Sequence, residues 1–336
     1  MNERTGQGMR DGVSPFENFD VTSLLEERSR RRADHPFLIW APFEGPGRTW
    51  SYAQFAHDVA RLAGGLAGLG VRTGDRVLVQ LENCPQAMLV LFACARIGAI
   101  HVPVAPAARP PELAWFAAFT DAVGVVTQPG LAAGIAQACP TLGWLAVTAT
   151  NAGAPADQDV LPAGAIGFES LFCEPTLARA PEPDLDALIM FTSGTTSRPK
   201  GVVWTHANVL WGARLGALQQ GLRAEDVVQL FLPLNHVVAL SWTFLPALWA
   251  GAALVLQPRF SASRYWPAAI DNRVTVGAQV IFTAKALAQQ EAPAHQIRQW
   301  TNALNPAGHE DHFRLRVLGA WGMTEMVGQG IVGDPH

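Results

Sequence analysis

Short strand-like segments alternate with longer helical segments along residues 76–139, and this alternation restricts the possible folds more than any other feature. Parallel strands need a long connection between them, and a helix is the usual one. The pattern therefore predicts a parallel sheet whose two faces are both covered by helices. The expected strands are 76–80, 99–103 and 124–127, and the expected helices are 85–97, 111–120 and 131–139.

The flanking segments extend this α/β pattern. Residues 1–19 are polar and rich in glycine, and we expect them to form a loose lead-in. Residues 150–167 and 291–312 are expected to be irregular connections. The other expected elements are helices at 21–32, 53–70 and about 205–220, and strands at 37–40, 48–52, 227–231, 252–256, 274–282 and 314–318.

The composition is that of a folded chain without a nucleic-acid partner. The 336 residues are 49% hydrophobic and 15% charged, which supplies sizeable cores and argues against disorder. Lys and Arg number 24 against 28 Asp and Glu, so no basic excess points to nucleic acid. Four widely spaced cysteines show neither CxxC pairs nor a zinc pattern, which predicts a reduced, cytoplasmic setting.

One apolar segment is long enough to be considered as a membrane span. Residues 237–257 contain no charged side chain and number enough to cross a bilayer. Asn235 and His236 precede the segment, however, and Pro246 and Gly251 interrupt it. We therefore expect a buried helix followed by a buried strand, and no membrane span.

A hydroxyl-rich stretch follows an expected buried strand at 187–191. It has five Ser or Thr residues in six positions, interrupted only by Gly194, and it ends near Lys200. Hydroxyls, exposed backbone N–H groups and a cation suit a polyphosphate. A Walker P-loop is excluded, because Pro199 precedes the lysine and Gly201 follows it. Composition alone would favour an ordinary surface loop, so the order of motifs along the chain decides the interpretation.

Four stretches match the order of motifs in one known superfamily. They are the hydroxyl-rich Thr192–Gly201, the Pro-Leu-x-His segment Leu232–His236, the segment Trp321–Glu325 and, more weakly, Asn83–Pro103. On these residues the chain, from about Val21 onward, resembles the adenylate-forming superfamily. That superfamily contains acyl-CoA synthetases, peptide-synthetase adenylation domains and luciferases. Trp321 stands where its motif usually has Tyr.

The resemblance implies an α/β fold of two packed, doubly wound, mostly parallel sheets flanked by helices. It also implies that residues 20–336 form an incomplete AMP-binding N-terminal domain, without the barrel and the small C-terminal domain. The two subdomains are expected at about 72–205 and at about 20–71 plus 206–336. Residues 302–303 and 317–325 look closest to small-acid CoA ligases of the crotonobetaine/carnitine type.

The resemblance also implies sites for ATP and Mg²⁺. The hydroxyl loop would hold the β- and γ-phosphates, Thr324 would bond to the α-phosphate, and Glu325 would hold Mg²⁺, which prefers oxygen ligands. The aromatic face of Trp321 would hold adenine, with burial in the core as the alternative. The expected nucleotide-binding residues are Thr192, Ser193, Gly194, Thr195, Thr196, Lys200, Asn302, Ala303, Trp321, Gly322 and Thr324, with Thr196 as a second metal ligand.

The resemblance places His236 beside the reacting carboxylate, as a gate or a positioning donor, and a purely structural histidine is the alternative. Trp242, Leu245 and Gly319–Ala320 either line the acyl pocket or belong to the core. Residues 308–312 contain two histidines but no His-Glu-x-x-His pattern, and we do not expect them to bind metal. The expected catalytic set is Lys200, His236, Thr324 and Glu325.

The implied reaction is the ATP-dependent activation of a small carboxylic acid as acyl-adenylate, followed by transfer to coenzyme A. A carrier-protein thiol as acceptor and a silent nucleotide- or acyl-binding chain are the alternatives. The family's ribose-binding acidic residue, hinge and mobile domain with a catalytic lysine have no counterpart up to His336, so we expect weak or absent turnover. The oligomeric state stays open, with a homodimer as one option.

Overall fold

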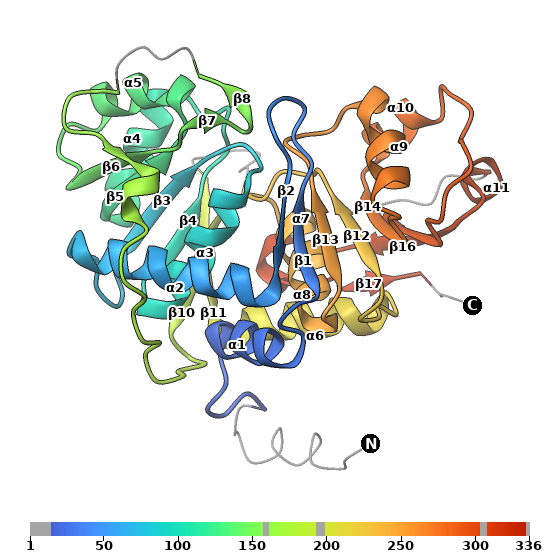
Figure 1. Cartoon of the computed structure of the whole chain (residues 1–336), viewed down its shortest axis with the longest axis horizontal. Helices are drawn as coiled ribbons and strands as arrows, with labels where there is room; N and C mark the ends of the chain where they lie inside the picture. Colours follow the sequence, from blue (N-terminus) through green and yellow to red (C-terminus); the bar gives the residue numbers. More distant parts are fainter. Residues whose placement is uncertain (1–14, 157–160, 193–198, 303–307, 334–336) are drawn as a thin grey trace.

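The computed structural model describes residues 15–156, 161–192, 199–302 and 308–333. Two large, mostly parallel sheets lie side by side, with helices between them and on their outer faces (Figure 1). This architecture confirms the expected α/β class with two doubly wound sheets flanked by helices.

The first sheet has seven strands and contains the alternating block of residues 76–139. Its strands run parallel except at one edge, where β10 and β11 form an antiparallel hairpin. The strand order is β11 (Lys200–Thr205), β10 (Asp186–Thr192), β4 (Ile100–Pro103), β3 (Arg76–Gln80), β5 (Ala122–Thr127), β6 (Trp144–Val147) and β9 (Ile166–Gly167).

The second sheet has eight strands, and antiparallel pairs occur only at its two edges. Its six inner strands are parallel. The strand order is β17 (Ile331–Val332), β16 (Arg316–Trp321), β15 (Gln299–Asn302), β14 (Val276–Gln279), β12 (Val227–Leu230), β13 (Ala253–Leu256), β1 (Pro36–Trp40) and β2 (Arg48–Ser51).

Helices between the sheets and on their outer faces complete the layers. In the first sheet, Val77 and Val79 face the inner core, whereas Leu78 faces the outer core with α4 and α5. Such alternation is the period of a strand whose two faces are both buried. The inner helices are α1 (Val21–Arg31), α2 (Tyr52–Gly68), α3 (Pro85–Ile97), α6 (His206–Gln219) and α8 (Leu245–Ala250); the outer ones are α4 (Pro110–Thr120), α5 (Pro129–Ala138), α9 (Ala262–Asp271), α10 (Ile281–Leu287) and α11 (His309–Phe313).

Two segments that we expected to be irregular contain regular elements. Residues 291–312 include β15, an inner strand of the second sheet, and α11. The sequence of β15 does not look strand-like because Gln299 and Thr301 are polar. In the structure both are buried, and each is hydrogen-bonded to Gln220. Residues 150–167 include β9 and the small hairpin of β7 (Thr150–Asn151) and β8 (Ala154–Pro155).

The charge-free segment folds as a buried helix followed by a buried strand, as expected. It forms α7 (Val237–Ala239), a π-helical turn at Leu240–Phe244, and α8, which ends at Gly251 with φ +80°. The strand β13 follows and is fully buried. Within the described ranges, no helix has the length and apolar character needed to cross a bilayer.

Two glycines of α2 differ in how closely the chain packs against them. A Cβ at Gly65 would lie 1.9 Å from the carbonyl oxygen of Leu171, which is backbone and cannot rotate away. A Cβ at Gly68, in the same helix, would meet nothing within 4 Å. Of these two glycines, Gly65 is therefore the one that α2 needs in order to approach the segment around Leu171.

We predict opposite effects of alanine at these two positions. Gly65→Ala should lower the free energy of unfolding by about 1–3 kcal/mol, because the new methyl group forces the backbone apart. Gly68→Ala should leave it unchanged or raise it by up to about 1 kcal/mol, because alanine favours the helix. Urea titration of both variants measures the difference, and equal values for the two would contradict this packing.

A buried charged network joins α1, α6 and the segment before β10. Arg179 donates to the carboxylate of Asp20 at 2.9 Å and lies 2.9 Å from Nε2 of His206. Asp20 also accepts from the backbone N–H of Ser23 and so caps α1. The pKa of His206 is lowered to about 4, chiefly by burial; Asp20 opposes this change and Arg179 adds to it.

This network predicts a pH dependence of stability. His206 is neutral in the folded chain and takes up a proton on unfolding at any pH between about 4 and its ordinary value near 6.5. The folded state should therefore lose up to about 1.4 kcal/mol per pH unit as the pH falls through this range. His206→Gln can still accept from Arg179 but does not titrate, so its urea curves should lose less stability on acidification than those of the wild type.

Candidate active site

The hydroxyl-rich stretch connects β10 and β11 at the edge of the first sheet. Thr192 ends β10, pairs with Lys200 at the start of β11, and is half-buried. The Lys200 side chain is exposed, and within the described chain it makes no hydrogen bond or ion pair. The predicted phosphate ligands Ser193, Gly194, Thr195 and Thr196 lie outside the described residues.

The second motif follows β12 of the second sheet. Its backbone turns tightly, because the N–H of His236 bonds to the carbonyl of Pro233 at 3.0 Å. The imidazole of His236 reaches solvent on one side. Protein atoms packed around the rest of the ring lower its pKa, so the ring is neutral at pH 7 and offers one donor and one acceptor.

The third motif follows β16, the neighbour of β15. Trp321 is 55% exposed, which excludes the alternative of burial in the core. Thr324 is half-buried and Glu325 is exposed in the short 3₁₀ turn Thr324–Met326. No described residue pairs with the Glu325 carboxylate, so its oxygens are free to bind a hard cation such as Mg²⁺.

The remaining predicted positions adjoin the third motif. Asn302 ends β15 and pairs with Gly319 of β16, whereas Ala303 lies outside the described residues. A Cβ at Gly322 would lie 2.5 Å from Cζ2 of Trp242, so the indole ring and this glycine are in direct contact. The candidate acyl-pocket residues Trp242, Leu245 and Ala320 are all buried.

Two side chains outside these assignments bond the first sheet to the second and third motifs. The indole N–H of the buried Trp204, on β11, donates to the backbone carbonyl of Thr324 at 3.0 Å. The carboxamide of Asn83, just after β3, bonds to the backbone of Leu232 and Leu234 at 2.9 and 3.0 Å. Sequence reasoning gave neither residue a role, although Asn83 begins the weakest of the four matching stretches.

These contacts join the first sheet to the second and third motifs. The strands β3, β4 and β10 run parallel, so their carboxyl ends share one edge of the first sheet. The strands β12, β15 and β16 share the corresponding edge of the second sheet. Ligands of open α/β sheets bind at such edges. Within the described chain, the segments at and after the carboxyl ends of β10, β12 and β16 carry a free lysine, a neutral histidine, an exposed aromatic ring and a free carboxylate.

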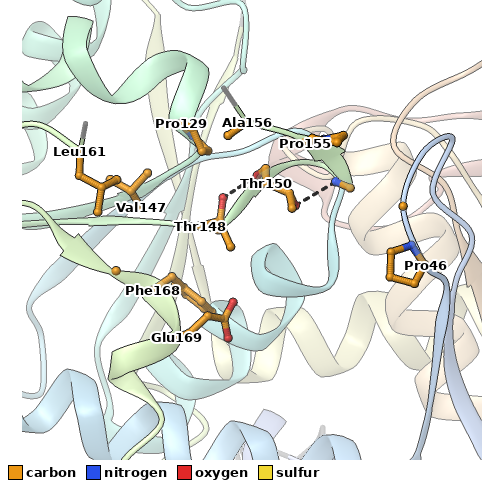
Figure 2. Close-up of a pocket in the computed structure, with 14 residues that line it drawn as sticks. Pro46, Pro129, Val147, Thr148, Thr150, Pro155, Ala156, Leu161, Phe168 and Glu169 are labelled. Atoms are coloured by element: carbon orange, nitrogen blue, oxygen red, sulfur yellow. Dashed lines mark hydrogen bonds between the residues drawn. The ribbon is translucent and has the colours of Figure 1, made fainter. Parts of the chain in front are cut away.

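A hollow of about 670 Å³ lies away from the three motifs. It is bordered by the turn of the β1–β2 hairpin, the β7–β8 hairpin and β9, as Figure 2 shows. Thr148 donates to the carbonyl of Thr150, whose hydroxyl accepts from Gly153. Its lining contains no residue of the three motifs. The predicted site residues that the structure describes therefore lie outside this hollow, at the motifs that follow β10, β12 and β16.

Comparisons with known proteins identify the family of this chain. The family model described as AMP-binding enzyme matches residues 25–336. The crotonobetaine/carnitine–CoA ligases of Salmonella paratyphi A and Salmonella typhi are each 33% identical over 94% of this chain. The chain spans 63% of the length of these two relatives.

Solved structures share the fold at lower identity. A putative long-chain-fatty-acid CoA ligase from Rhodopseudomonas palustris is 23% identical with a TM-score of 0.82, covering 94% of this chain and 78% of that one. An anthranilate CoA ligase in complex with anthranoyl-AMP is 20% identical with a TM-score of 0.85, covering 96% and 63%. The match over residues 25–336 makes this chain a member of the AMP-binding enzyme family.

Proposed function

We propose that this chain is the nucleotide- and acid-binding part of a carboxylate–CoA ligase that forms an acyl-adenylate. The observation that carries the proposal is that Trp204 and Asn83 bond the sheet that carries Lys200 to the backbone of the second and third motifs. Family membership and the CoA-ligase relatives support the same reaction.

In the first step, a carboxylate oxygen of the acid attacks the α-phosphorus of ATP, and the bond to pyrophosphate breaks. The site has to hold two anions in line and offset their repulsion. Lys200, with the hydroxyl loop beside it, would bind the β- and γ-phosphates, and Thr324 would donate to the α-phosphate. Mg²⁺ bound to Glu325, with Thr196 as its second predicted ligand, would supply positive charge to the phosphates.

The neutral His236 would act on the acid. A neutral imidazole can donate one N–H to the carboxylate of the acid. Because the ring carries no charge, this hydrogen bond is not also an ion pair that would hold the acid in place. The exposed ring of Trp321 would stack on adenine, near Asn302 and Gly322. In the second step, the sulfur of coenzyme A attacks the acyl carbonyl, AMP leaves, and the thiol proton passes to solvent.

The acid is proposed to be small. Trp242 is buried against Gly322, so its indole ring occupies space beside the third motif. The curated relatives are named for crotonobetaine and carnitine, which makes these two acids the first to test. A carrier-protein thiol in place of coenzyme A and a silent binding chain remain the alternatives.

Two further proposals concern the setting of the protein. All four cysteines are free thiols, and three of them are buried, which supports a reducing, cytoplasmic location. A homodimer is a proposal that the molar mass in solution tests.

The reaction class is tested by exchange of labelled pyrophosphate into ATP. With crotonobetaine or carnitine present, exchange above the level without acid would support adenylation by the 336-residue chain. Binding of MgATP without any exchange would favour the silent binding chain, and acyl transfer to a carrier protein but not to coenzyme A would favour the other alternative.

Lys200 offers a sharply controlled test, because the sequence contains only one other lysine, Lys285. Lys200→Ala should weaken ATP binding about tenfold or more, since a charge-assisted hydrogen bond to phosphate is lost. Lys285→Ala removes the other exposed lysine, from α10, and should bind ATP as the wild type does. Calorimetric titration measures both, and wild-type affinity in Lys200→Ala would refute the phosphate-binding role.

Glu325 is tested through the metal. Glu325→Gln keeps the size of the side chain but loses its charge, so Mg²⁺ should no longer raise the affinity for ATP as it does in the wild type. Glu291→Gln removes another exposed carboxylate and serves as the control. An unchanged Mg²⁺ dependence in Glu325→Gln would rule out this residue as the ligand.

A further inference from the structure

Asn83 connects three segments of the chain through one side chain. Its Nδ2 donates to the carbonyl of Leu232 at 2.9 Å and to that of Gln257 at 3.3 Å. Its Oδ1 accepts from the N–H of Leu234 at 3.0 Å. The side chain is 3% exposed, so water does not compete for these bonds.

The three bonds cross from one sheet to the other. Asn83 follows β3 of the first sheet, whereas Leu232 and Gln257 follow β12 and β13 of the second. Only a carboxamide can do this, because it carries two N–H donors and a carbonyl acceptor on one planar group. Aspartate would lack the donors and would place a charge beside two carbonyl oxygens.

These bonds fix the turn that carries His236. Leu232 and Leu234 are held directly, and the N–H of His236 returns to the carbonyl of Pro233. The phosphate-binding hairpin β10–β11 belongs to the same sheet as Asn83, through β4. The carboxamide therefore sets where His236 lies relative to that hairpin.

We propose that Asn83 is a positioning residue, which holds the Leu232–His236 turn so that the His236 imidazole meets the acid beside the bound phosphates. The claim that Asn83 affects the reaction with the acid rests on the proposed function. The claim that Asn83 holds the turn rests on the hydrogen bonds alone. Asn83 touches neither ATP nor the acid in this role and acts only through the turn.

Gln80 provides a matched control. It lies at the end of the same strand, is 2% exposed, and donates to the carbonyls of Ala105, Pro106 and Ala108 at 3.3, 3.3 and 2.8 Å. These partners belong to the loop after β4 of the same sheet, not to the turn of His236. Loss of the Gln80 carboxamide should thus cost a similar amount of stability without releasing that turn.

The experiment compares Asn83→Ala with Gln80→Ala in the 336-residue protein. In Asn83→Ala, the N–H of Leu234 should exchange with solvent at least about tenfold faster, and the NMR signals of the His236 ring should shift. Gln80→Ala should leave both as in the wild type. Asn83→Ser, which creates a smaller cavity, serves if Asn83→Ala fails to fold.

The catalytic part is read from pyrophosphate exchange with crotonobetaine as the probe acid. Asn83→Ala should raise the KM for the acid about tenfold and change the KM for ATP by less than about twofold. If the wild type catalyses no exchange, adenylation by this chain alone is refuted, and amide exchange and NMR still decide whether Asn83 holds the turn. Wild-type protection of Leu234 in the Asn83 variants, or equal effects in Gln80→Ala, would overturn the proposal.

Discussion

The structure depends on how the carboxyl ends of two parallel sheets meet. Each sheet alone carries only part of the proposed site: the first carries the hairpin with Lys200, and the second carries His236, Trp321 and Glu325. Two hydrogen-bonding side chains cross between them, Asn83 to the Leu232–His236 turn and Trp204 to the carbonyl of Thr324. Both are buried, so these bonds exchange little with water and fix the spacing of the parts.

Aromatic contacts in the inner core join the layers that carry this junction. Phe37, Phe55, Phe92 and Phe244 form a chain of edge-on contacts with ring centroids 4.9 to 5.9 Å apart. They come from β1, α2, α3 and the π-helical turn after His236, and so join the second sheet to the inner helices. Rigid packing of this kind resists relative movement of the layers.

Much of the fold could be predicted because apolar strands and helices alternate with clear periods. The strand β15 could not, since its buried Gln299 and Thr301 are polar, and only their bonds to Gln220 make them acceptable in a sheet. The site was predicted from the order of motifs, whereas the exposure of Trp321 required the structure. Asn83 and Trp204 were missed because their partners are distant backbone groups, which carry no sequence signal. The roles of all the site residues remain predictions, and Ser193 to Thr196 and Ala303 also lie outside the described ranges.

Hydrogen–deuterium exchange with and without MgATP tests the central claim, that both sheets contribute to one nucleotide site. The account predicts slower exchange in the peptides that contain Lys200 and in those that contain Thr324 and Glu325, at the same ligand concentration. Peptides that border the 670 Å³ hollow, such as those around Thr148 and Thr150, should not change. Protection confined to one of the two motifs, or found around the hollow instead, would contradict the account.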